Sequence, residues 1–131
     1  MEVTLSNREI INAIMSNSIK ELMKVSFSDI KISWDIMKNV EKLEVISNRY
    51  LKLERELINQ YALKDNDGNI KVDEKGNPEF PPHSEFYTKQ GELLNCDETI
   101  NIKQIKLSCL QGSGLSPAIL YDLKFMIDDD N

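Results

Sequence analysis

The sequence predicts an α+β fold in which a long helical hairpin carries a small antiparallel sheet and two short C-terminal helices. Apolar residues recur every three or four positions through residues 25–64, a stretch without Gly or Pro. Shorter segments near both ends alternate apolar and polar residues, as strands do. The chain has 131 residues, of which 40% are hydrophobic and 29% charged. We therefore expect a single domain over 1–131, with a helical hairpin at about 6–62, a hairpin extension at about 63–82 and an α+β part at about 83–127.

The N-terminal segment predicts a strand followed by a capped helix. In "EVTL", Val3 and Leu5 fall on one face of a short strand. The next residues, "SNRE", have the S-x-x-E spacing of a capping box, with Ser6 as N-cap and Glu9 at the third helical position. We expect this helix to run without a break to about Lys24.

A second helix of about 34 residues, roughly 50 Å long, is predicted after Ser28 and Asp29. Its apolar positions form one continuous seam made of Ile36, Val40, Leu43, Ile46, Tyr50, Leu53, Leu57 and Tyr61. Such a rod is longer than a small domain is thick, so its seam needs cover from the first helix, from C-terminal elements or from a second subunit. A homodimer through the long helix therefore remains open. For Trp34 we favour a core position, with an exposed interface anchor as the alternative.

Residues 63–80, "LKDNDGNIKVDEKGNPEF", resemble a calcium loop because acidic residues surround Gly68. An EF-hand alignment places Asp65, Asp67 and Glu74 correctly but puts Leu63 and Lys71 at ligand positions. The exiting helix is also missing, because prolines follow. "DNDGN" and "EKGN" are instead strong turn signals around the strand-like "IKVDE". We predict an acidic hairpin without a metal.

The remaining elements follow from caps and alternation. Ser84 caps a short helix, "EFYTKQGELL", and "TINIKQIKLSCL" predicts one or two strands. Ser116 as N-cap with Pro117 at the first helical position begins a final helix that should reach about Ile127. We identify no internal repeat.

The charge of the chain is −6 and is unevenly distributed. Residues 1–64 carry ten basic and nine acidic residues, a sum of +1, whereas residues 65–131 carry six and thirteen, a sum of −7. An acidic chain is poorly suited to bind phosphates, so we expect no direct nucleic-acid contact. The bland interpretation of the acidity is solubility, and the sharper one is an acidic face for a basic partner. The candidate partner-binding residues are Asp65, Asp67, Asp73, Glu74, Glu79 and Trp34.

Residues suited to catalysis are few. The only histidine, His83, follows two prolines, and its position predicts an exposed loop residue. Cys96 and Cys109 lack metal-ligand spacing, and we expect reduced, partly buried thiols. "QGSGLS" lacks the residues of a phosphate loop and is interpreted as a break before a helix. We therefore predict no catalytic residue, cofactor or metal. With no signal peptide and no apolar run that could span a bilayer, the expected location is the cytoplasm.

Three segments carry a resemblance to a known family. They are the helix end and turn in "RELINQYALKDNDGNIKVDEKGNPEF", the "LLN" helix, and "IKLSCLQGSGLSPAILYDLKFMI". Together they resemble a family of small, functionally unassigned proteins of tailed phages and prophages of low-GC Gram-positive bacteria. Its most specific elements are Tyr61, the turn from Asp65 to Gly68, and the helix start at Leu115–Ser116–Pro117. The resemblance implies a phage origin, and it carries over no catalytic residue.

Two classes of function remain. The first is a non-enzymatic phage accessory protein that binds and inhibits or redirects a host protein in the host cytoplasm, for example a defence nuclease complex with a basic nucleic-acid-binding surface. The second is a virion or tail-assembly component that uses the long helix for oligomerisation. An enzyme is a distant third.

Overall fold

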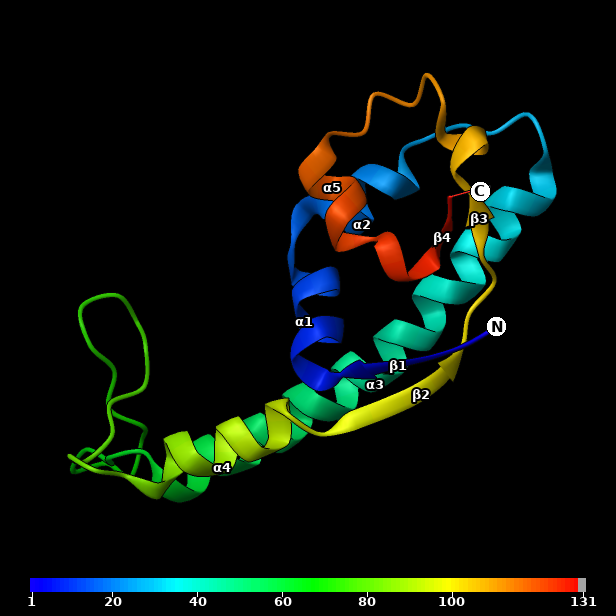
Figure 1. Cartoon of the computed structure of the whole chain (residues 1–131). Helices are drawn as coiled ribbons and strands as arrows, with labels where there is room; N and C mark the ends of the chain where they lie inside the picture. The colour runs from blue at the N-terminus through cyan, green and yellow to red at the C-terminus, as the bar shows by residue number, and fades with distance from the viewer. Residues whose placement is uncertain (130–131) are drawn as a thin grey trace.

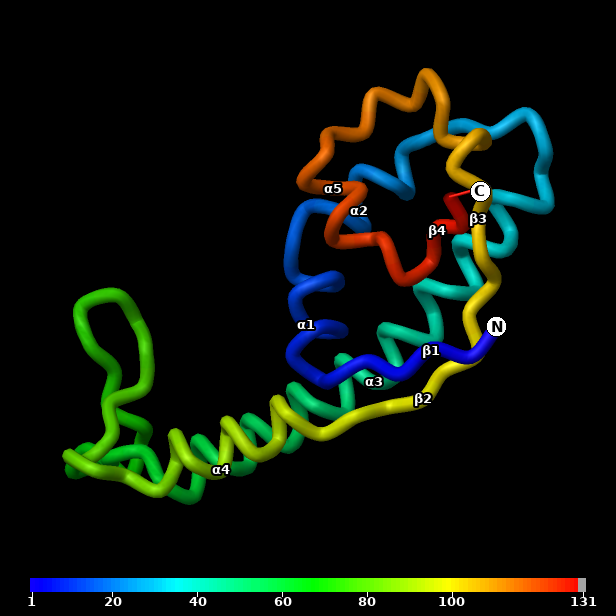
Figure 2. Tube along the Cα trace, viewed as in Figure 1, coloured from blue at the N-terminus to red at the C-terminus, as the bar shows by residue number. Residues whose placement is uncertain are grey.

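The computed structural model describes residues 1–129 and confirms the α+β fold. One long helix, α3 (Ile30–Tyr61), runs through the whole molecule. Figure 1 shows the remaining elements gathered around its first half, while its second half projects away beside α4 (Glu85–Leu94). We call residues 1–50 and 97–129 the head, and residues 51–96 the arm. The tube in Figure 2 shows residues 62–84, here named the tip loop, at the end of the arm farthest from the head.

The N-terminal strand and its cap are confirmed. β1 (Glu2–Ser6) pairs antiparallel with β2 (Asp97–Asn101), with Val3 opposite Ile100. The Ser6 Oγ accepts a hydrogen bond from the Glu9 amide at 3.1 Å, and the Ser6 amide donates to Glu9 Oε1 at 3.2 Å. This reciprocal pair starts α1 (Asn7–Met15).

The prediction of one unbroken helix to Lys24 is wrong. Ser16 adopts extended backbone with ψ 164° and separates α1 from α2 (Asn17–Met23). Its hydroxyl both donates to the Ala13 carbonyl at 3.2 Å and accepts from the Ser18 amide at 3.4 Å. Serine side chains compete for backbone partners in this way, so "SNS" can end one helix and begin the next. The bend places Ile19 and Leu22 in the core and leaves Met15 at 68% exposed.

The long helix begins where predicted, with Asp29 as N-cap and its Oδ1 accepting from the Lys31 amide at 2.9 Å. The first five seam residues, from Ile36 to Tyr50, are buried. Beyond Tyr50 the seam emerges from the head, and Leu53 is 39% exposed. The expectation of one continuous buried seam is therefore wrong for the second half of the helix, because only α4 lies beside it there.

The C-terminal part keeps the predicted order of elements with shorter helices and strands. β3 (Ile105–Lys106) pairs in parallel with β4 (Ile127–Asp128), and the predicted strand stops there because η1 (Leu107–Leu110), a 3-10 turn, follows. The final helix α5 (Pro117–Asp122) ends earlier than predicted and continues as the 3-10 turn η2 (Lys124–Met126). This C-terminal part contributes five buried side chains to the core of the head: Ile102, Ile105, Leu110, Leu123 and Met126.

Candidate interaction surfaces

The tip loop contains a short repeat that was not predicted from the sequence. "DNDGN" at 65–69 and "DEKGN" at 73–77 have the same backbone hydrogen bonds. In each copy the aspartate amide donates to the asparagine carbonyl at 2.8 Å, and the glycine amide donates to the aspartate carbonyl at 3.0–3.1 Å. Gly68 and Gly76 have φ of 80° and 81°, a conformation that favours glycine. The common spacing of Asp, Gly and Asn was the signal that could have revealed the repeat.

Backbone hydrogen bonds among three evenly spaced residues, Leu63, Lys71 and Glu79, join the two turns. The Leu63 amide donates to the Glu79 carbonyl, the Lys71 amide to the Leu63 carbonyl, and the Glu79 amide to the Lys71 carbonyl, at 2.8–2.9 Å. These three bonds close a ring. The predicted simple hairpin is therefore corrected to two successive turns with only the isolated bridges Lys64–Ile70 and Val72–Pro78.

Two of the predicted partner-binding carboxylates accept hydrogen bonds from the backbone amides of these turns. Asp65 Oδ1 accepts from the amides of Asp67 and Asn69 at 2.9 and 3.0 Å. Asp73 Oδ1 accepts at the same two distances from the amides of Lys75 and Asn77. Both side chains thus hold the turns in place, as aspartate does at the start of Asx-turns. Replacing either one changes the loop's structure as well as its charge.

The other predicted carboxylates of the tip loop differ in their availability. Asp67 and Glu74 are exposed, whereas Glu79 is half-buried at the base of the loop. Lys64, Lys71 and Lys75 lie among them, so residues 63–82 carry five acidic and three basic side chains. The local charge is −2, much smaller than the −7 of the second half of the chain. Asp67 and Glu74 are the groups best placed to meet a partner.

An aromatic cluster supports the base of the tip loop. Phe80 stacks on Phe86 of α4, with ring centroids 4.1 Å apart, and contacts Tyr87 edge-on at 5.6 Å. Phe86 is buried, whereas Tyr87 is 62% exposed. The Tyr61 hydroxyl lies 3.4 Å from Glu85 Oε2 and joins the ends of the two arm helices. These contacts hold the loop on the arm.

Trp34 is far from the tip loop and is not in the core. Its side chain is 58% exposed, and Ile30, one turn earlier on the same side of α3, is 79% exposed. The favoured core position is therefore wrong, and the alternative of an exposed anchor remains. Tyr61 follows Trp34 by 27 positions on α3, so these two residues lie about 40 Å apart along the helix axis. The structure does not bring the predicted partner-binding residues together in one site.

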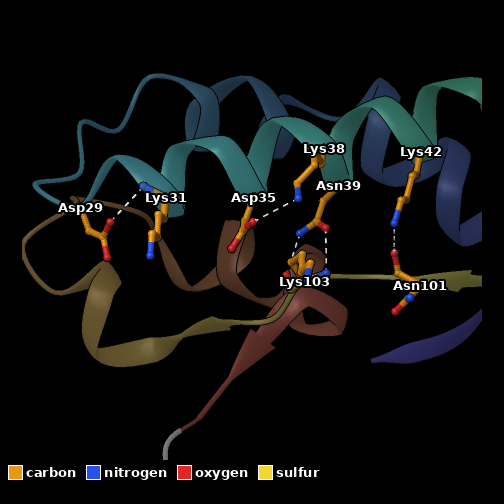
Figure 3. Close-up of polar contacts among 8 residues, drawn as sticks. All are labelled: Asp29, Lys31, Asp35, Lys38, Asn39, Lys42, Asn101 and Lys103. Atoms are coloured by element: carbon orange, nitrogen blue, oxygen red, sulfur yellow. Dashed lines mark hydrogen bonds and ion pairs between the residues drawn. The ribbon is translucent and has the colours of Figure 1, made fainter.

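Polar contacts join the first half of α3 to the chain between Asn101 and Lys103 (Figure 3). The Asn39 side chain is fully buried; its Nδ2 donates to the Lys103 carbonyl at 2.8 Å, and its Oδ1 accepts from the Lys103 amide at 2.9 Å. Lys42 Nζ reaches the Asn101 carbonyl at 2.6 Å. Lys38 pairs with Asp35 at 3.6 Å. Asn39 therefore fixes the segment between β2 and β3 against the long helix.

A buried phenol joins the head to the arm. Tyr50 is 3% exposed, and its hydroxyl donates to Glu54 Oε2 at 2.6 Å. Gln90 Nε2 of α4 donates to the same oxygen at 3.2 Å. Burial, followed by the hydrogen bond to Glu54, raises the pKa of Tyr50. At the same junction, the Asn7 side chain donates to the Leu93 carbonyl at 2.8 Å.

The residues considered for chemistry lie apart from one another. His83 is exposed and has a left-handed backbone with φ 57°. Cys96 is exposed, contrary to the expectation of a partly buried thiol, while Cys109 is half-buried as expected. Within residues 1–129, no three His, Cys, Asp or Glu side chains gather as a metal site would require. In the same range, no helix is long and apolar enough to cross a membrane.

Comparison with known proteins gives no match to a protein-family model, a curated protein or a solved structure. The resemblance to phage proteins therefore stays a prediction from the sequence.

Proposed function

We propose that this protein is a phage-encoded, non-enzymatic accessory protein that binds a host protein in the host cytoplasm and inhibits or redirects it. The class of target that we favour is a defence nuclease complex whose basic surface normally receives nucleic acid. The observation that supports the proposal is the tip loop. It begins about 18 Å beyond Tyr50 along the arm, and two hydrogen-bonded turns stabilise its conformation. A projecting, internally braced loop loses little conformational freedom on binding.

The exposed Asp67 and Glu74 are the charges that would meet the basic surface. Complementary charge mainly raises the rate of association and makes it dependent on salt, because exposed charges are screened beyond about 8 Å at physiological ionic strength. Asp65 and Asp73 would contribute by shaping the loop, since their carboxylates are bonded to its own amides.

The test begins with affinity purification of the tagged chain from infected cells and identification of the bound proteins. The association rate of the identified partner is then measured across a salt series for the parent and for the double variant Asp67→Lys/Glu74→Lys. The matched control is Glu41→Lys/Glu44→Lys, which makes the same change in charge at two exposed positions of α3 in the head. Circular dichroism establishes that all three proteins are folded.

We expect the tip variant to associate more slowly and with a flatter salt dependence, while the control keeps the parent's rate. Equal rates for the tip variant and the control would contradict the tip-loop role. Trp34→Ala tests the second exposed surface separately, since one partner would have to span about 40 Å to reach both.

A virion or tail-assembly component remains the second candidate, and the specific observation that favours it is the exposed seam of α3 beyond Tyr50. Long helices with an uncovered apolar stripe are common in oligomeric assemblies. Mass spectrometry of purified virions separates the two candidates: abundant protein in virions favours assembly, whereas expression early in infection and absence from virions favours the accessory role.

A further inference from the structure

An apolar groove of about 370 Å³ lies between α3 and α4 on the arm. Three leucines line it, Leu53 and Leu57 from α3 and Leu93 from α4. Leu53 is 39% exposed and the other two are half-buried. Along the arm helices, only Phe86 is fully buried. The groove therefore lies on the part of α3 that extends beyond the head, where the apolar seam packs only against α4.

Two helices packed side by side cannot enclose the apolar stripe that both present to the same groove. Helical segments of this length are marginal in water, and most of their stability comes from burying an amphipathic face. Two further helices would convert the pair into a four-helix bundle, whose core is formed from such apolar stripes. A second copy of the arm supplies two helices of matching length.

Two of the charges along the groove, Glu56 and Lys89, fit such a copy. Glu56 lines it from α3, and Lys89 and Glu92 line it from α4. The ion pairs formed within residues 1–129 involve other side chains, so these three charges are not paired with one another in the single chain. A two-fold axis parallel to the arm places the same surface of each copy against the other, with each α3 facing the partner's α4. The negative Glu56 then meets the positive Lys89 twice.

We propose that this groove is a self-association site, at which two copies of the chain pack arm against arm with Glu56 of each beside Lys89 of the other. The pairing buries Leu53, Leu57 and Leu93 of both copies in one core and leaves both tip loops free at their ends. Self-association does not depend on the host-binding proposal, and either one can fail alone.

Sedimentation equilibrium of the full chain tests the proposal over about 1 µM to about 500 µM, a range that covers weak and moderate affinities. We expect the mass to rise with concentration from the 15.1 kDa of one chain toward twice that value. Leu53→Arg should keep the chain monomeric throughout. Val45→Arg is the matched control, because Val45 is also exposed, at 60%, and lies on the same helix within the head.

A charge-exchange experiment tests the pairing itself. Glu56→Lys places two lysines together in a homodimer, and Lys89→Glu places two glutamates together, so each variant alone should associate at least tenfold more weakly than the parent. In an equimolar mixture of the two variants, the substituted position of each chain faces the substituted position of the other, and the two new charges are opposite. The native Glu56 and Lys89 meet at the second contact. The mixture should therefore recover dimers that contain one chain of each kind.

A monomeric mass at every concentration would overturn the proposal and leave the groove to a helix of another protein. A dimer that Leu53→Arg does not disturb, or variants whose mixture recovers no association, would overturn the arm-to-arm geometry. Circular dichroism of Leu53→Arg separates loss of association from loss of fold. Should that variant unfold, the charge-exchange pair gives the same decision without altering the apolar core.

Discussion

Asn39 stabilises the head because its side chain is the hydrogen-bond partner of the Lys103 main chain, which lies between β2 and β3. Its amide makes two hydrogen bonds to the main chain of Lys103, at 2.8 and 2.9 Å, and is completely buried. An apolar side chain of similar size removes the partner of both main-chain groups, whose hydrogen bonds are part-buried. An unpaired buried polar group costs about 1–3 kcal/mol.

We therefore expect Asn39→Leu to lower the free energy of unfolding by at least about 2 kcal/mol. Asn48→Leu is the control, because it makes the same substitution at an exposed position of the same helix, where changes are usually within about 0.5 kcal/mol. Urea denaturation of the two variants and the parent provides the comparison. Equal midpoints for both variants would mean that the Asn39 bridge contributes little.

The buried Tyr50 predicts a loss of stability in alkaline solution. Its pKa is raised in the folded protein, so the folded state holds the phenolic proton more tightly than the unfolded chain does. The corresponding stability is fully present below about pH 10, the ordinary tyrosine pKa, and is lost as the pH rises through the higher folded-state value. Thermal melts of the parent and of Tyr50→Phe between neutral pH and about pH 11 isolate this residue from the other tyrosines and the lysines. We expect the parent to lose more stability across that range than the variant does.

At the scale of the elements, α3 is one helix with two environments. Leu43 is completely buried in the head, while Leu53 is 39% exposed on the arm, although both belong to the same sequence pattern. We expect Leu43→Ala to cost about 2–5 kcal/mol and Leu53→Ala about 1 kcal/mol in dilute solution. Chemical denaturation measures both. A cost for Leu53 as large as that for Leu43 would mean that the arm is covered even in the single chain.

The element starts could be predicted from the sequence because a helix cap is a local signal. Ser6, Asp29, Ser84 and Ser116 are all N-caps, as their neighbouring residues indicate. The break at Ser16 escaped prediction because apolar spacing continues across it, and periodicity alone cannot tell a bend from a straight helix. The 3-10 turn after Lys106 was missed because two residues of alternation do not determine how long a strand is.

The candidate surfaces were less predictable, since they depend on packing between distant segments. The exposure of Trp34 follows from which side of α3 the head covers, and sequence spacing does not specify that side. The acidic residues of the tip loop were found from composition, but composition cannot separate Asp65 and Asp73, which cap the turns, from Asp67 and Glu74, which face solvent. The common spacing between aspartate and glycine in the two turns could have identified the turn-forming aspartates.

At the scale of the whole molecule, burial falls steeply from head to arm. The principal core cluster draws its long-helix members from Ile36, Val40, Leu43 and Ile46, and none from beyond Tyr50. Regions with few buried apolar contacts open by local unfolding, without the rest of the protein.

Hydrogen exchange should reveal this gradient in dilute protein, where the proposed dimer has dissociated. We expect amides of α4 and of α3 beyond Leu53 to exchange at least about tenfold faster than those between Ile36 and Tyr50, which corresponds to about 1.4 kcal/mol of easier opening. Mass spectrometry of peptic fragments gives the rates. Uniform protection along α3 would contradict the division into head and arm.

The ring of backbone bonds among Leu63, Lys71 and Glu79 bears on how this protein can evolve. Because the first and last residues of the ring are bonded directly to each other, the chain leaves α3 and returns to α4 at nearly the same place. The two helices therefore impose no demand on the identity of the side chains between Asp65 and Asn77, apart from the turn-forming aspartates and glycines. The exposed positions of such a segment can therefore change in sequence without altering the two helices that display it.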